Sequence, residues 1–125
     1  MAESGQKILI LDRDKAEKLG GLAKESFGGM FFVDSPLQRK AKIKDSTDLA
    51  LSDWHRFAEF EEKDILPKSW AKTYIERSVP DIYEELQARG INFFPVVNWV
   101  ERGMYVPGNS VPRLHLIWGT GHCEC

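Results

Sequence analysis

Residues 7–12 read Lys7-Ile8-Leu9-Ile10-Leu11-Asp12 and form the first ordered pattern in the chain. A continuous apolar run closed by an acid is typical of a strand that is buried on both faces of a parallel sheet. We therefore predict a strand here and an α/β class of fold. Such a strand needs neighbours along both edges, and only six residues precede the run. We expect that the rest of this sheet comes from outside the chain.

Length and composition limit the possible functions. The 125 residues suit one domain at most, and a hydrophobic content of 42% argues against general disorder. Since 17 basic residues face 19 acidic ones, the net charge of −2 favours neither nucleic acid nor an anionic membrane as a partner. No apolar run approaches the roughly 20 residues of a membrane helix. The start of the chain does not resemble a signal peptide, and Cys123 and Cys125 lie too close together to staple a fold, so we expect a cytoplasmic protein.

A glycine-rich segment follows the predicted strand. The pairs Gly20-Gly21 and Gly28-Gly29 predict a loop, because glycine adopts positive φ and weakens helices. Successive backbone N–H groups of such a loop can bind phosphate or approach a flavin closely. An acid such as Asp12, at the end of a buried strand, can accept hydrogen bonds from ribose hydroxyls. The alternatives are an Asp that begins a turn and a glycine-rich surface loop.

The middle of the chain predicts helices. After a short extended piece at 30–33, Ser35 suits an N-cap, Pro36 the first helical position, and Gln38 completes a capping box. One helical segment should end near 57–60 and a second should run from about 68 to 89, with Pro80 kinking or splitting it. Gly90 suits the position after the C-cap. The expected buried stripes are Ala50, Trp54, Phe57 and Ala58 in the first segment, and Trp70, Tyr74, Ile82, Tyr83 and Leu86 in the second.

The last third predicts strands at 91–99 and 113–118, joined through a turn at 107–110, so the isolated piece would be α+β. Arg113 and His115 share a face of the second strand and could hold an anionic or carbonyl oxygen of a substrate. The favoured alternative is a solvated strand face. Arg102 and Tyr105 are weaker candidates of the same kind.

Other catalytic motifs are absent from the sequence. The tail His122-Cys123-Glu124-Cys125 holds metal-capable side chains, but one residue between two cysteines and no second pair do not make a zinc site, so we predict no metal. The chain has no Ser-His-Asp order and no GxxxxGK[ST] loop.

Several of these motifs occur in an order that resembles a known family. The matching stretches are Ile8–Asp12, Gly20-Gly21, Ser26-x-Gly28-Gly29, Val33-Asp34-Ser35-Pro36, Asp53-Trp54, and Asn109-Ser110-Val111-Pro112-Arg113-x-His115-x-x-Trp118-Gly119-Thr120-Gly121. In them the chain resembles FAD-dependent oxidoreductases of the fumarate reductase and ketosteroid dehydrogenase superfamily, and most closely the bacterial FAD-binding dehydrogenases. The last stretch is the most specific of the set.

The resemblance implies a Rossmann-type FAD-binding domain, with residues 1–34 as part of it and 35–125 as helices and strands of an inserted substrate region. It implies FAD as the cofactor and hydride transfer between flavin and an activated C–C bond of a small organic or steroid-like substrate. Asp12 would contact the adenosine ribose. The backbone of six residues would pass along the pyrophosphate and isoalloxazine: Gly20, Gly21, Ala23, Ser26, Gly28 and Gly29. Arg113 and His115 would lie in the substrate region.

The chain also departs from the family. Relatives carry a first strand and a G-x-G-x-x-G turn that binds the pyrophosphate, and this sequence contains no such turn. We therefore expect an incomplete Rossmann domain that lacks the first strand, an internal piece of a flavoenzyme whose partner would be the remaining part. The alternatives are a non-catalytic fragment with an exposed apolar face, or a helical interaction module built on residues 36–90 without a cofactor.

Overall fold

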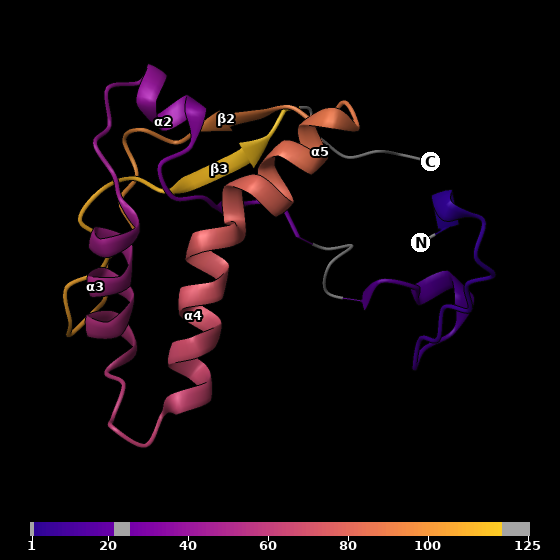
Figure 1. Ribbon diagram of the computed structural model, residues 1–125, viewed down its shortest axis with the longest axis horizontal. Coiled ribbons are helices and arrows are strands. Elements are labelled where there is room, and N and C mark those ends of the chain that lie inside the picture. Colours follow the sequence, from indigo (N-terminus) through magenta and orange to yellow (C-terminus); the bar gives the residue numbers. More distant parts are fainter. Residues whose placement is uncertain (1, 22–25, 119–125) are drawn as a thin grey trace.

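A computed structural model describes residues 2–21 and 26–118. Short 3₁₀ turns, helices and strands alternate along the chain, and helices dominate its middle third (Figure 1). The elements, in order, are η1 (Ala2–Ser4), η2 (Ala16–Lys18), β1 (Met30–Phe31), α2 (Pro36–Lys40), α3 (Thr47–Ala58), α4 (Ile65–Arg77), η3 (Ser78–Tyr83), α5 (Glu84–Ala88), β2 (Phe93–Pro95) and β3 (Leu114–Ile117).

The three strands form one antiparallel sheet in the order β1-β3-β2. Met30 pairs with His115 on one side of β3, and Phe94 pairs with Leu116 on the other. The predicted strands near 91–99 and 113–118 are therefore confirmed in shorter form, and the extended piece after Gly29 supplies the third strand. Among the described residues the arrangement is α+β, and no parallel Rossmann sheet occurs there.

The start of α2 confirms the predicted capping box. Ser35 Oγ accepts from the backbone N–H of Gln38, and the Gln38 side chain accepts from the backbone N–H of Ser35. Pro36 occupies the first turn, where a missing N–H costs nothing. The next helix, α3, begins at a second cap, Ser46, and ends at Ala58, within the predicted range.

The long second helical segment is split, as Pro80 predicted. α4 runs regularly to Arg77, a π-helical stretch (η3) carries Pro80, and α5 continues to Ala88. Proline removes an N–H donor and clashes with the preceding turn, so the regular ladder cannot pass through it. Gly90 follows α5 with φ +84°, the left-handed conformation expected after a C-cap.

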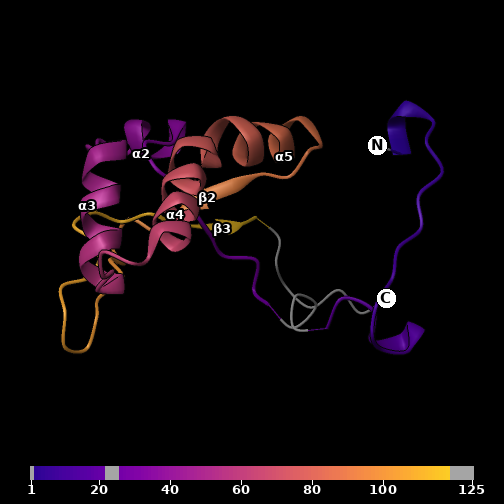
Figure 2. The same ribbon diagram turned by 60° about the horizontal axis from the view of Figure 1, so that its bottom comes forward.

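Two small clusters form the core. Phe32, Tyr83 and Phe93 join the sheet to η3, whereas Val33, Ala50 and Ile75 lie where α3 and α4 pack side by side (Figures 1 and 2). The predicted stripes are right only in part. Ala50 and Tyr83 are buried, but three predicted positions, Phe57, Ala58 and Trp70, are exposed, and Ala71 and Ile75 fill the core side of α4 instead.

The predicted strand at 7–12 is wrong for this chain. Residues 6–12 form no regular secondary structure, and the exposed fractions of Ile8, Leu9, Ile10 and Leu11 run from 50% to 83%. In both ribbon views the indigo segment that carries them lies to one side of the body, with an ion pair from Glu3 to Arg89 at the end of α5 (Figures 1 and 2). A strand that is buried on both faces needs neighbours, and the described residues offer it none.

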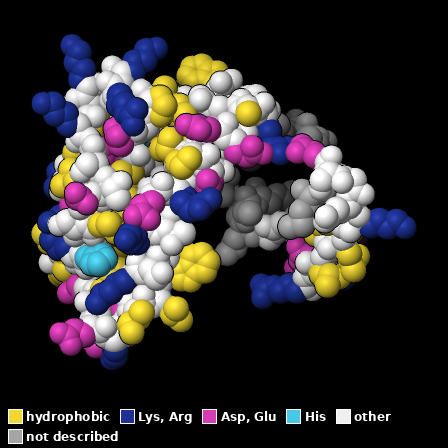
Figure 3. All heavy atoms as spheres, viewed as in Figure 1, with side chains coloured by type: hydrophobic (Ala, Val, Ile, Leu, Met, Phe, Trp, Pro, Cys, Tyr) yellow, Lys and Arg dark blue, Asp and Glu magenta, His cyan; other side chains and the backbone are white. Residues whose placement is uncertain are grey.

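The surface carries charges of both signs. On the face in Figure 3 the acidic and basic side chains are interspersed rather than gathered by sign. Within the described ranges, no helix has the length and apolar character to span a membrane.

Candidate cofactor-binding segment and adjacent cavity

Asp12 lies against the start of the glycine-rich loop, as the sequence predicted. Its carboxylate accepts from the backbone N–H of Asp14 at 3.0 Å and from that of Gly20 at 3.2 Å. These hydrogen bonds, that from Asp14 first, lower the pKa of Asp12, so its exposed carboxylate is ionised at neutral pH. The bond to Asp14 is also the turn contact that the alternative interpretation predicted, and the two roles are compatible.

The glycines of the loop adopt the conformations for which glycine is needed. Gly20 and Gly21 have φ of +93° and +47°, and Gly28 has φ of +72° with its N–H donated to Ser26 Oγ. At Gly29 a Cβ atom would lie 2.4 Å from a ring carbon of Phe27. Ala23, Lys24 and Glu25 lie outside the described residues.

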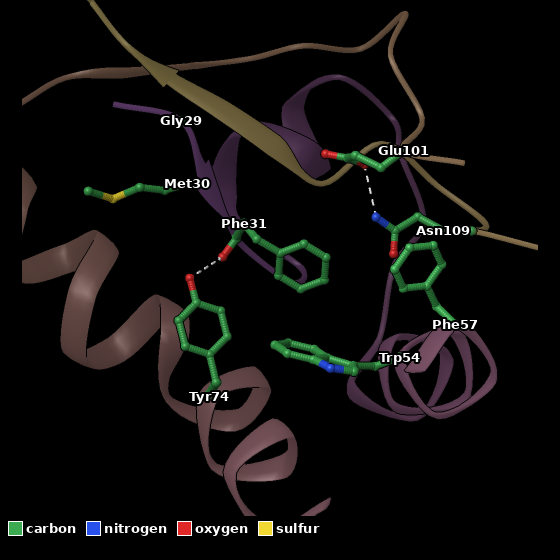
Figure 4. A pocket seen from close by; sticks show the side chains of 9 residues that line it. Gly29, Met30, Phe31, Trp54, Phe57, Tyr74, Glu101 and Asn109 are labelled. Carbon is green, nitrogen blue, oxygen red and sulfur yellow. Dashed lines mark hydrogen bonds between the residues drawn. The ribbon is translucent and has the colours of Figure 1, made fainter. Parts of the chain in front are cut away.

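A cavity of about 580 Å³ begins at Gly29 (Figure 4). Its walls come from β1 and the residue before it, from α3 and α4, and from the loop that precedes β3. The lining residues are Gly29, Met30, Phe31, Trp54, Phe57, Tyr74, Glu101, Gly108 and Asn109.

Four aromatic side chains line the apolar wall, and three of them, Phe31, Trp54 and Tyr74, contact one another. The ring centroids of Phe31 and Trp54 are 5.6 Å apart, those of Trp54 and Tyr74 are 5.9 Å apart, and both pairs meet edge to face. The Tyr74 hydroxyl donates to the carbonyl of Phe31 at 2.9 Å. Burial raises the pKa of Tyr74 despite that contact, so its hydroxyl stays neutral, with its proton donated to the Phe31 carbonyl.

The polar edge of the cavity consists of Glu101 and Asn109. Asn109 Nδ2 donates to Glu101 Oε2 at 2.9 Å, and the Asn109 backbone N–H donates to the Glu101 carbonyl at 2.8 Å. Gly108 allows this close approach, since a Cβ atom there would lie 2.0 Å from the Glu101 carbonyl oxygen. Sequence reasoning missed Glu101 and Gly108. Asn109 was part of the most specific motif but had no assigned role.

Arg113 lies at the centre of a buried ion cluster behind this wall. Its guanidinium donates to Asp45 and to Asp53 at 2.7–2.8 Å, and the three side chains are at most 1% exposed. Burial alone would lower the pKa of Arg113, but the two carboxylates outweigh it and raise the pKa. The guanidinium also lies 5.6 Å from the ring centroid of Phe31. The expected solvated strand face is therefore wrong, because acids distant in sequence cover Arg113.

Asp53 connects the cluster to the loop before β3. It accepts from the backbone N–H and the hydroxyl of Ser110. Besides Arg113 it pairs with a second cation, since Arg56 Nη2 lies 2.6 Å from Asp53 Oδ1. Burial would raise the pKa of Asp53, but the bonds from Ser110 and Arg113 outweigh it and the pKa falls. The cluster thus ties α3 to the segment that carries Arg113.

His115 is also fully buried. Its Nδ1 lies 2.8 Å from the carbonyl oxygen of Arg113, which can only accept, so Nδ1 carries the proton. Nε2 then accepts from the Ser35 hydroxyl at 2.7 Å. Burial lowers the pKa of His115, and the ring is neutral. Neither His115 nor Arg113 is among the residues that line the cavity.

The remaining candidates do not join this site. Arg102 and Tyr105 are exposed, and Arg102 lines a separate shallow hollow beside Trp99. The tail from His122 to Cys125 lies outside the described residues. Within the described ranges no group of three His, Cys, Asp or Glu side chains is placed to hold a metal ion.

The described residues fit one edge of a dinucleotide. The ionised carboxylate of Asp12 can accept ribose hydroxyls, and among the described residues nothing lies within 4 Å of a Cβ position at Gly21, which leaves its backbone open to close approach. In the described part of the chain no buried side-chain polar atom lacks a partner. The fit therefore rests on the exposed carboxylate and on the glycine backbone.

A carboxylate beside a glycine-rich loop is an arrangement that dinucleotide-binding domains use, with the acid on the ribose hydroxyls. The family model of the FAD binding domain matches residues 1–122, and the chain belongs to this family, which indicates FAD as its cofactor. Among curated proteins, the chain is 46% identical over 125 residues to a KsdD-like steroid dehydrogenase of Mycolicibacterium smegmatis and, equally, to a KsdD-like steroid dehydrogenase of Mycobacterium tuberculosis.

These matches cover 97% of this chain but only 22–23% of the two mycobacterial proteins. The chain therefore spans less than a quarter of the length of the relatives that it matches. No solved structure matches it significantly.

Proposed function

We propose that this chain is the FAD-contacting part of an FAD-dependent oxidoreductase. The complete enzyme transfers a hydride between flavin and an activated C–C bond of a small organic or steroid-like substrate. The observation that carries the proposal is the match to the FAD binding domain family over residues 1–122, together with the contact between Asp12 and Gly20. The names of the mycobacterial relatives support a steroid-like substrate.

The proposed cofactor contacts follow the glycine-rich loop. Asp12 accepts the ribose hydroxyls of the adenosine half, which an ionised carboxylate does well. Backbone N–H groups and open glycine positions pass along the rest of the cofactor, in the set Gly20, Gly21, Ala23, Ser26, Gly28 and Gly29. Flavin supplies the redox chemistry, and the protein supplies orientation and electrostatics.

We propose supporting roles for Arg113 and His115, the two catalytic candidates. Arg113 holds the Phe31 ring and the Asn109 amide in place at the cavity wall. His115 holds the N-cap of α2 through Ser35. Residues 1–34 then belong to the FAD-binding part and 35–125 to the substrate region, in a cytoplasmic enzyme whose remaining part supplies the pyrophosphate turn that this sequence lacks.

The proposal is tested in a chimaera. This chain replaces the equivalent segment of the M. smegmatis relative, and the protein is mixed with FAD, desalted and examined by visible absorption. We expect a retained flavin band. Asp12→Ala should lower FAD affinity about tenfold or more, because it removes charge-assisted hydrogen bonds. The matched control, Asp14→Ala, removes a carboxylate that accepts, within the described part of the chain, from the N–H of Lys15 alone, and should leave FAD affinity unchanged. A chimaera that folds but retains no flavin contradicts the proposal.

A second candidate concerns the isolated chain. The exposed run Ile8–Leu11 and the missing G-x-G-x-x-G turn favour a polypeptide that binds FAD weakly and is not an enzyme by itself. A compact monomer with stoichiometric FAD in size-exclusion chromatography would overturn this view. The third possibility, a helical interaction module on residues 36–90, predicts that removal of 1–34 leaves folding intact. Met30, Phe32 and Val33 in the core argue against it.

A further inference from the structure

One wall of the cavity belongs to a long connection without helix or strand, residues 96–113 between β2 and β3. Such connections of more than roughly 12–15 residues are uncommon in compact domains and usually serve a function. Its residues 101–110, which we call the strap, supply Glu101, Gly108 and Asn109 to the cavity. Figure 4 shows Glu101 and Asn109 together on one side of the cavity, across from Tyr74. The strap is thus the polar wall of the cavity.

The strap is closed on itself. The Asn109 backbone N–H donates to the Glu101 carbonyl at 2.8 Å, and the Asn109 side-chain amide donates to Glu101 Oε2 at 2.9 Å. Between these ends the turn is tight, since a Cβ atom on Gly103 would lie 2.2 Å from the Val106 carbonyl oxygen. Surface loops whose ends meet in this way are compact units and are frequently functional. We therefore expect the strap to move as one piece.

Little apolar packing joins the strap to the body. Within the described ranges, neither core cluster includes a side chain of the strap. Met104 and Tyr105 at its tip are 86% and 93% exposed. The tip meets the body at Phe57, because a Cβ atom on Gly103 would lie 3.0 Å from that ring. In both ribbon views the loop that carries the strap projects beside α3 (Figures 1 and 2). Segments with few buried apolar contacts open at a lower free energy than the core.

Polar contacts fasten the strap instead, and two of them are buried. The Ser110 N–H donates to Asp53 Oδ2 at 2.8 Å, and Arg113 donates to Asn109 Oδ1 at 2.8 Å. The side chains of Asp53 and Arg113 are at most 1% exposed. Solvent therefore does not reach these two fastenings while the strap is in place.

Arg56 provides a third fastening, which solvent does reach. Its Nη2 donates to the Gly108 carbonyl at 3.2 Å and lies 2.6 Å from Asp53 Oδ1. The Arg56 side chain is 42% exposed, so water and salt compete for both contacts. Because ion pairs near the surface contribute little to stability, this is the weakest of the three fastenings, and we expect release to begin here.

We propose that the strap is a movable wall of the cavity: it leaves α3 as a unit while the rest of the fold stays intact, and Arg56 sets how often it does so. Opening releases the Ser110 N–H from Asp53 and gives solvent access to Trp54 on another wall of the cavity. The strap thereby controls entry to the cavity. Its movement needs no flavin and is independent of the class of ligand, so the inference stands apart from the proposed function.

Hydrogen exchange of single backbone amides, followed by NMR on the 125-residue chain, tests the opening. The Ser110 N–H should exchange at least about tenfold faster than the N–H of Ile75 in the core of α4, because a local opening suffices. Arg56→Met removes the guanidinium and should accelerate exchange at Ser110 about fivefold, with Ile75 changed less than about twofold. The matched control, Arg39→Met, loses an exposed ion pair with Asp34 on α2 and should leave exchange at Ser110 unchanged.

Salt provides a test that requires no substitution. Raising NaCl from about 0.1 M to about 1 M shortens the screening length from roughly 10 Å to roughly 3 Å. This should weaken the pair between Arg56 and Asp53 and accelerate exchange at Ser110 about twofold relative to Ile75. In Arg56→Met the same change of salt should leave that ratio unaltered.

Fluorescence quenching tests whether the opening reaches the cavity. Phe replaces the three exposed tryptophans, Trp70, Trp99 and Trp118, so that Trp54 alone reports from the cavity wall. Acrylamide, a small neutral quencher, should quench Trp54 about twofold faster in Arg56→Met than in the parent protein. Arg39→Met should not change the rate of quenching.

Three results would overturn the inference. Ser110 exchanging no faster than Ile75 would show that the strap does not open by itself. Equal acceleration of both amides in Arg56→Met would show a global effect, and unchanged quenching of Trp54 would show that the cavity stays closed. All three measurements are made without flavin. A chimaera that retains no FAD therefore leaves this inference intact, and a rigid strap leaves the proposed function intact.

Discussion

Arg113 is the residue on which the largest buried charge cluster depends. With Asp45 and Asp53 it forms a set of one cation and two carboxylates whose side chains are at most 1% exposed. The cluster is partly balanced from outside by Arg56, which is 42% exposed. Taking such charges out of water is costly, and hydrogen bonds to Ser110 and Asn109 offset part of the cost.

Arg113→Met should therefore lower the free energy of unfolding by about 3–5 kcal/mol, because the buried Asp45 loses its cation and the buried Asp53 loses one of its two. Urea denaturation followed by circular dichroism measures the change. Arg39→Met is the matched control: this guanidinium pairs with Asp34 at the surface, and its loss should cost less than about 1 kcal/mol. Equal effects of the two substitutions would contradict the central role of the cluster.

His115 gives stability a dependence on pH. Burial lowers its pKa in the folded chain below the ordinary value of 6.5, so the unfolded chain binds a proton first as the pH falls. The free energy of unfolding should be constant above about pH 6.5 and decrease below it, by up to about 1.4 kcal/mol per pH unit, until the lowered pKa is reached. In His115→Gln the slope in this window should disappear. Carboxylates with lowered pKa values, such as Asp53, act only below about pH 5.

At the scale of elements, the short helix α2 depends on a single serine for its cap and for its connection to the sheet. Ser35 Oγ accepts from the N–H of Gln38 and donates to His115 Nε2, so one buried hydroxyl caps the helix and joins it to β3. Gln38 extends this connection to Asp45 and to the Pro112 carbonyl. The five-residue helix is therefore held by tertiary contacts rather than by its own hydrogen bonds.

Ser35→Ala should lower the free energy of unfolding by about 2–3 kcal/mol, because α2 loses its cap and a buried imidazole nitrogen is left without a partner. Ser46→Ala removes an exposed cap of α3 and should lower the free energy of unfolding by about 0.5–1 kcal/mol. Thermal unfolding of both variants gives the comparison. A smaller loss for Ser35 than for Ser46 would show that the contact with His115 does not stabilise the fold.

At the scale of the whole molecule, the exposed run Ile8–Leu11 is the largest departure from a self-sufficient domain. Its four side chains are 50–83% exposed in a segment that lies beside the body (Figure 1). Adjacent exposed apolar side chains tend to bind other chains. The relatives are longer than this chain. Their greater length is consistent with additional residues that pack against this run, where the described residues do not.

We expect the isolated chain to self-associate through this run. Leu9→Lys combined with Leu11→Lys should raise the dissociation constant of self-association by at least about tenfold, because the run loses apolar area and gains positive charge. Sedimentation should then show a shift toward the monomer. Ser52→Lys combined with Ser69→Lys adds the same charge on exposed faces of α3 and α4, and should leave association unchanged. If both double variants behave alike, net charge and not the run controls association.

Local sequence patterns predicted those features that depend on neighbours along the chain. The capping box at Ser35, the split at Pro80 and the left-handed Gly90 each follow from the conformational limits of a single residue type. The contact of Asp12 with the glycine loop also spans only eight residues. The family resemblance rested on such short motifs, and the family match confirms it.

Tertiary structure alone decided the rest. Arg113 and His115 read as a solvated strand face, because their partners Asp45, Asp53 and Ser35 lie 60–80 residues away and no local pattern marks them. The cavity likewise needs four segments to converge before Glu101 and Asn109 meet the aromatic wall. The run at 7–12 shows the opposite case: its residue types favour a buried strand, but a strand forms only where other strands offer their backbone hydrogen bonds.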